Sequence, residues 1–163
     1  MDLSEILIGI AEIATALAGF TGVVVVFGSR SHGSWEAGDR LRLAFLLEAS
    51  LTAGGFALLA LVLLNSQLDQ NITWAIISGL WALFMCISLY FSYDKINQNQ
   101  RLGSDTDRTA NWVVSIVFVA LIVIQCVNAL VWGEFAPVLA ALVANLAGAA
   151  MQFARLIRSA FQT

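Results

Sequence analysis

Two glutamates stand inside long apolar segments of the sequence, Glu12 within residues 6–27 and Glu48 within residues 43–64. A charged side chain near the bilayer centre costs roughly 2.5 to 3.5 kcal/mol on insertion scales, so such residues usually face water or a partner. Carboxylates in such positions attract cations and exchange protons. The pair therefore indicates either an ion or proton path, or neutral hydrogen-bonded groups that serve packing.

Small and acidic residues share one face of each of these two segments. Because a helix advances about 100° per residue, the set in the first segment falls within an arc of about 80°. That set is Glu5, Gly9, Glu12, Ala16, Gly19 and Val23, and the second segment carries Ala44, Glu48, Thr52 and Gly55. We predict a wet path along these faces, lined by Glu5, Gly9, Glu12, Ala16, Gly19, Glu48 and Thr52.

The two glutamates also begin similar stretches of sequence. From Glu12 the chain reads EIATALAGF and from Glu48 it reads EASLTAGGF, so both stretches have Gly at +7 and Phe at +8. Adjacent spans run in opposite directions, which predicts Glu12 in the outer part of the membrane and Glu48 in the inner part, as in the inverted repeats of transporters. The expected difference in depth is about 15 Å at 1.5 Å per residue. A tight acid pair within one subunit is therefore not expected.

Three amide side chains lie inside other apolar segments and are candidate supporting groups. Gln125 and Asn128 are one turn apart, and Asn145 lies near the middle of the last segment. These amides either hydrogen-bond Glu12 or hold helices together, a common use of Asn and Gln in membranes that is worth about 1 kcal/mol each. Both uses are considered, and the sequence favours the packing use.

Five segments are long enough to carry these residues across a membrane, because a span needs roughly 20 mostly apolar residues. The predicted spans are residues 6–27, 43–64, 72–93, 112–132 and 135–156. Only Gly133 and Glu134 separate the last two, which predicts a tight helical hairpin. Pro137 suits the first turn of the last helix, where its missing N–H would be unpaired anyway. The expected fold is an all-α integral membrane protein with residues 1–163 forming a single membrane domain.

The basic residues are placed on one side of this arrangement. All eight Lys and Arg fall in three stretches, with Arg30, Arg40 and Arg42 in the first, Lys95, Arg101 and Arg108 in the second, and Arg155 and Arg158 in the third. Lys and Arg are retained on the cytoplasmic side of short loops, which predicts an outside N-terminus, a cytoplasmic C-terminus and the cytoplasmic (plasma) membrane. The acidic start MDLSE is unlike a secretory signal, so the first helix is expected to stay.

Aromatic residues near the predicted span ends fit the interfacial belts of membrane proteins. Trp74 and Trp132 are expected at the outer interface, and Tyr90, Tyr93 and Trp112 at the inner one.

Two basic stretches, residues 28–42 and 94–110, are predicted as turn-rich connectors. His32 in the first has no adjacent second group, so we expect it to be solvated and assign it no role. Asp105 and Asp107 in the second are expected to cap the fourth helix.

Composition excludes several classes of protein. The 163 residues are 60% hydrophobic and 12% charged, about half the charged share of a soluble domain. A net charge of −3 without interleaved basic and aromatic residues argues against a nucleic-acid partner. No nucleotide-binding glycine loop, HExxH, GxSxG or catalytic pair occurs, so we expect no enzyme, cofactor or metal. Cys86 and Cys126 are expected to be small packing residues.

Small residues at four-residue spacing predict close helix packing within or between subunits. They are Ala14, Ala18 and Gly22 in the first span, and Ala140, Ala144 and Gly148 in the last. A five-helix subunit has little room for an internal pore, which favours a ring of copies. The expected function is thus a homo-oligomeric channel for cations or protons, lined by the first helix. The alternative is a non-conducting scaffold or sensory subunit that docks a cytoplasmic protein through its basic loops.

Overall fold

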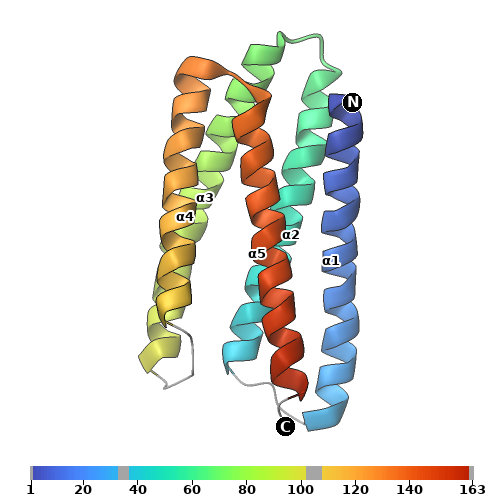
Figure 1. Ribbon diagram of the computed structural model, residues 1–163, viewed down its shortest axis with the longest axis vertical. Helices are drawn as coiled ribbons and strands as arrows, with labels where there is room; N and C mark the ends of the chain where they lie inside the picture. Colours follow the sequence, from blue (N-terminus) through green and yellow to red (C-terminus); the bar gives the residue numbers. More distant parts are fainter. Residues whose placement is uncertain (1, 33–36, 102–107, 162–163) are drawn as a thin grey trace. The chain divides into compact units, whose positions relative to one another are not determined.

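The computed structural model describes residues 2–32, 37–101 and 108–161, and its elements are all helical, with no strand in those ranges. The helices are α1 (Leu3–His32), α2 (Ala37–Leu64), α3 (Gln70–Arg101), α4 (Arg108–Val127), the π-helix η1 (Asn128–Trp132) and α5 (Phe135–Phe161) (Figure 1). The predicted all-α class is therefore confirmed.

Five helical segments of the described chain are long and apolar enough to cross a membrane. They are Leu3–Val23, Gly38–Leu64, Gln70–Tyr93, Val113–Trp132 and Phe135–Arg158. Each coincides with one of the predicted spans, because an apolar run of this length has few alternatives to a membrane helix. The structure thus describes a membrane-embedded protein with five candidate spans.

The helices extend beyond the predicted spans into the stretches expected to be turn-rich connectors. α1 continues to His32, α2 already begins at Ala37, and α3 continues through Arg101. The end of α3 contains neither Gly nor Pro, and a helix pairs its own backbone groups whether or not lipid surrounds it. The expected caps Asp105 and Asp107 lie outside the described residues.

The chain divides into two compact units where the sequence predicts one membrane domain. We call Met1–Leu61 with Leu142–Thr163 the terminal unit, and Val62–Ala141 the central unit. The terminal unit contains α1 and most of α2 and α5, whereas the central unit contains α3, α4 and η1.

In the terminal unit, α1 contacts both of its neighbours. A Cβ atom placed on Gly54 would lie 3.1 Å from the Cβ of Ala14, so the small residue on α2 lets α1 approach closely. The rings of Phe20 on α1 and Phe153 on α5 have centroids 6.2 Å apart. α1 runs antiparallel to α2 and parallel to α5 (Figure 1). These two contacts fix which residues of the three helices lie at the same level.

In the central unit, α3 packs against both α4 and η1. A Cβ on Gly79 of α3 would meet the Cβ of Ala129 at 3.8 Å, an ordinary contact distance. Trp74 at the start of α3 lies against Phe135, with ring centroids 4.9 Å apart. Trp74 is consequently buried in the protein, although its position near a span end predicts an interfacial belt residue. Tyr90, Tyr93 and Trp132 are exposed, as belt residues are.

Candidate functional site

The buried amide of Asn128 organises the hairpin between α4 and α5. Its Nδ2 donates to the Oγ of Ser78 over 2.7 Å and to the backbone carbonyl of Glu134 over 2.9 Å. Its Oδ1 accepts a hydrogen bond from the backbone N–H of Glu134 at 3.0 Å. Both ends of a fully buried amide are therefore satisfied, and they tie α3, η1 and the turn together.

Two further contacts close the same hairpin. The Nε2 of Gln125 donates to the backbone carbonyl of Pro137 over 2.6 Å, while its buried Oε1 has no partner among the described residues. The backbone N–H of Gly133 donates to the carbonyl of Asn128 over 2.8 Å, which is the i to i−5 pattern of a π-helix. The predicted turn at Gly133 and Glu134 and the place of Pro137 in the first turn of α5 are confirmed.

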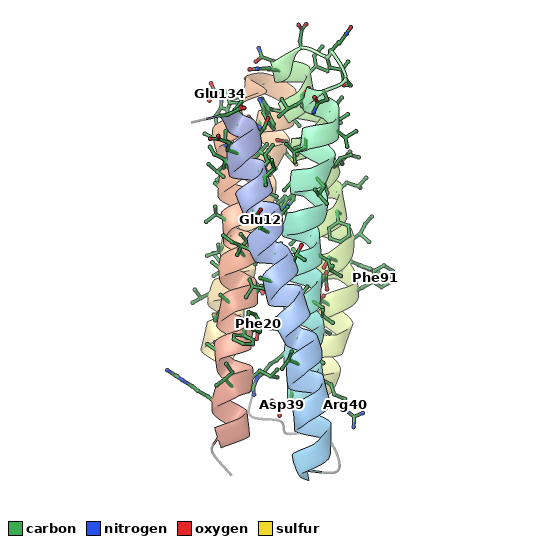
Figure 2. The ribbon with its side chains drawn as sticks, turned by 90° about the vertical axis from the view of Figure 1, so that its right-hand side faces the viewer. Glu12, Phe20, Asp39, Arg40, Phe91 and Glu134 are labelled. Carbon is green, nitrogen blue, oxygen red and sulfur yellow. The ribbon has the colours of Figure 1, made fainter. Side chains whose placement is uncertain are left out.

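The acidic face of α1 is turned outward on the chain. Glu5, Glu12, Ala16, Gly19 and Val23 are exposed and Gly9 is half-buried. A Cβ placed on Gly9 or Gly19 would meet nothing within 4 Å. Figure 2 shows Glu12 well inside the length of α1, away from both helix ends. No hydrogen bond or ion pair of Glu12 occurs within the described ranges, so the amide partner proposed from the sequence is not formed there.

The acidic set on α2 does not form one uniform face. Ala44 and Gly55 are exposed, Thr52 is buried, and Glu48 is half-buried and makes a polar interaction.

The two glutamates lie at different levels of the terminal unit. Glu12 precedes Ala14 by two residues and Glu48 precedes Gly54 by six. Because Ala14 and Gly54 are in contact and the helices are antiparallel, these offsets add to about 12 Å along the axis at 1.5 Å per residue. The geometry brings no tight acid pair together, in agreement with the separation expected from the sequence.

Asn145 differs from the other two supporting amides. It is buried on α5, and its Nδ2 has no hydrogen-bond partner among the described residues. The same condition holds for four atoms that the sequence analysis did not single out: the Oγ of Ser50 and the Oε1 of Gln152 in the terminal unit, and the Oγ1 of Thr73 and the Nε1 of Trp81 in the central unit. Gln152 follows Asn145 by seven residues, a helical spacing that places both on one face of α5 and is visible in the sequence.

The remaining candidate groups are the cysteines and the small residues. Cys86 and Cys126 are unpaired and exposed on the chain, so they are not buried packing residues as the sequence suggested. The described ranges contain no group of three or more His, Cys, Asp or Glu able to hold a metal. Of the small residues expected at helix contacts, Ala14 is buried against α2, whereas Gly22 and Ala140 are exposed.

Comparison with models of known families, with curated proteins and with solved structures gives no match to this chain. Its class rests on its own helices, as an all-helical protein with five spans long and apolar enough for a membrane.

Proposed function

We propose that this protein is a small homo-oligomeric channel that passes cations or protons along a path lined by α1. Several copies would surround the path, each contributing the face that carries Glu5, Glu12, Ala16 and Gly19. Rings of carboxylates attract cations, and an ionisable group within the membrane can also relay protons. Glu48 would form a second station about 12 Å from Glu12 along the axis, and Thr52 would lie between their levels, about 6 Å from Glu12.

The exposed position of Glu12 carries this proposal. The apolar span of α1 covers Leu3–Val23, and Glu12 is one residue from its centre. The carboxylate is exposed on the chain and has no hydrogen-bond partner in the described ranges. Lipid around it would cost several kcal/mol, so water or a second copy is the favourable neighbour. Small residues along the same face would allow copies to approach closely.

The proposed orientation places the N-terminus outside and the C-terminus in the cytoplasm of a cell whose plasma membrane holds the protein. The distribution of Lys and Arg supports it, because all eight lie at the ends of the spans that would face the cytoplasm. Arg42 forms an ion pair with Asp39 over 2.9 Å, and the other basic residue in that turn, Arg40, is exposed.

Ion flux into liposomes tests the function. Pure protein is reconstituted, and proton and K⁺ flux are recorded for wild type, Glu12→Gln and the matched control Glu134→Gln. Glu134 is exposed in the hairpin turn and uses only backbone atoms in its hydrogen bonds with Asn128. Gln keeps shape and hydrogen-bonding capacity but removes the ionisable group.

We expect flux through wild type and Glu134→Gln, and at least a tenfold loss or an altered pH dependence in Glu12→Gln. Absence of flux in wild type over a range of voltage and pH, with the oligomer intact, contradicts the channel.

The alternative is a non-conducting scaffold or sensory subunit that docks a cytoplasmic protein. The hydrogen bonds of Gln125 and Asn128 favour it, because in them polar side chains of a candidate span hold the chain's own helices together. A silent Glu12→Gln variant together with a destabilised Glu12→Leu variant would leave this alternative standing. Loss of a stoichiometric partner upon charge reversal of Arg40 and Arg42 would support it directly.

A further inference from the structure

Three polar side-chain atoms in the terminal unit are buried without a partner among the described residues. They are the Oγ of Ser50, the Nδ2 of Asn145 and the Oε1 of Gln152. Ser50 is fully buried and Asn145 is 1% exposed. Buried polar groups in proteins nearly always have a partner, which is protein or ordered water. Each of these three atoms therefore requires a hydrogen-bond partner that is not among the described residues.

Helical periodicity places the three side chains on faces that the fold turns inward. Ser50 lies four residues before Gly54 and thus on the face of α2 that packs against α1. On α5, Asn145 and Gln152 share a face whose other members are buried, namely Leu142, Ala149 and Leu156.

The contacts of α1 give the levels of these groups. Glu12 and Asn145 each lie eight residues before a member of the Phe20 and Phe153 pair, so they share one level of two parallel helices. Gln152 directly precedes Phe153 and is level with Gly19. Ser50, four residues from Gly54 on the antiparallel helix, is level with Ala18. The three polar groups thus span about 10 Å along the helix axes at 1.5 Å per residue.

The donor and acceptor types of these three groups select their ligand. The Nδ2 of Asn145 only donates, the Oε1 of Gln152 only accepts, and the hydroxyl of Ser50 does both. A cation would leave the Asn145 donor unpaired, and an anion would leave the Gln152 acceptor unpaired. Water donates and accepts, and it complements all three groups.

We propose that Ser50, Asn145 and Gln152 bind a row of water molecules inside the α1–α2–α5 unit, extending from the level of Glu12 toward the C-terminal half of α1. At a hydrogen-bond spacing of about 2.8 Å, roughly four molecules cover the row. Resting on the proposed function, this row carries protons within each subunit in series with the path that α1 lines between copies. Protons pass along hydrogen-bonded water, whereas a metal ion would need a wider opening to keep its hydration shell.

Water-edited solid-state NMR on the isotope-labelled protein in bilayers tests the site itself. Asn128 is the matched control, because it is an equally buried Asn whose side-chain amide is fully bonded within the protein. We expect magnetisation from water to reach the side-chain amides of Asn145 and Gln152 at least three times faster than it reaches the side-chain amide of Asn128. Equal, slow transfer to all three amides overturns the proposal.

Flux measurements on variants test the route. Asn145→Leu and Gln152→Leu are compared with Thr21→Val, which removes a buried hydroxyl of the same unit that already donates to the Leu17 carbonyl. We expect the two Leu variants to lower proton flux at least tenfold. The proton flux of Thr21→Val should equal that of wild type. Proton flux unchanged by the Leu variants overturns the route. Water contact at Asn145 with neither proton nor K⁺ flux in wild type refutes the channel instead and leaves the water site standing.

Discussion

Asn128 and Ser78 are joined by a buried hydrogen bond of 2.7 Å that connects η1 to α3 across fifty positions of the sequence. The same Asn128 amide also binds both backbone groups of Glu134. One side chain thereby ties η1 and the turn that follows it to α3. The Asn128 amide thus stabilises the fold of the central unit.

Replacement of Asn128 should destabilise the protein. In Asn128→Leu the Ser78 hydroxyl and the backbone of Glu134 lose their partners, and each unpaired buried group costs about 1 to 3 kcal/mol. We expect a loss of about 2 kcal/mol in the free energy of unfolding, measured by denaturant titration in mild detergent. Ser78→Ala and the double variant complete a mutant cycle. Strictly additive losses would contradict a direct coupling between the two side chains.

Gly133 should tolerate no side chain. Its φ of 62° is left-handed, and a Cβ there would lie 2.7 Å from the backbone carbonyl oxygen of Asn71. Left-handed backbone alone costs a non-glycine residue about 1 to 2 kcal/mol, so Gly133→Ala should lose about 2 kcal/mol or more. Gly55→Ala is the control, because its Cβ meets nothing within 4 Å. Equal stability of the two variants in thermal unfolding would refute the described turn.

The contact of α1 with α2 should depend on the size of one residue. Gly54→Leu places a large side chain where a Cβ already lies 3.1 Å from Ala14, and overpacking of this kind costs about 1 to 3 kcal/mol. The neighbouring Gly55→Leu adds the same side chain in open space and should change stability little. Unfolding midpoints of both variants check the prediction. A larger loss in Gly55→Leu would mean that α2 is rotated differently about its axis.

The membrane spans could be predicted from the sequence, but much of the site could not. Apolar runs of about 20 residues leave a chain few choices, and Gly133 with Pro137 mark a hairpin by local rules. The partner of Asn128 is fifty residues away, and no local pattern points to Ser78. Trp74 has the residue type and the position near a span end that are typical of a belt residue. It is nevertheless buried, because Phe135, which is distant in sequence, packs on it.

The outward position of Glu12 could be predicted from the sequence only in part. Its face was predictable from helical spacing, because Glu12, Ala16 and Gly19 recur at helical intervals. Whether a neighbouring helix covers that face depends on tertiary packing, which periodicity does not contain. The unpaired atoms of Ser50 and Gln152 were missed for the same reason, since Ser and Gln become notable only once they are buried without partners.

The proposed orientation predicts opposite accessibility for two positions outside the five spans. In a background lacking Cys86 and Cys126, a cysteine introduced by Ser66→Cys should react with an impermeant thiol reagent applied to intact cells. One introduced by Ser104→Cys should react only after permeabilisation. The reverse pattern would contradict the orientation. Labelling of both from one side would contradict the number of spans between them.

The central claim is that the small and acidic face of α1 borders water inside the membrane, and cysteine accessibility along α1 measures this most directly. Gly19 lies on that face, and Ile13 lies about 120° away around the helix. Both residues are exposed on the chain, so the two sites differ in the face of α1 on which they lie and not in their burial. In reconstituted Cys-free protein, Gly19→Cys should react with a water-soluble thiol reagent and the reaction should block ion flux, whereas Ile13→Cys should stay unreactive. Equal inertness of the two cysteines in a protein that assembles normally would contradict the account.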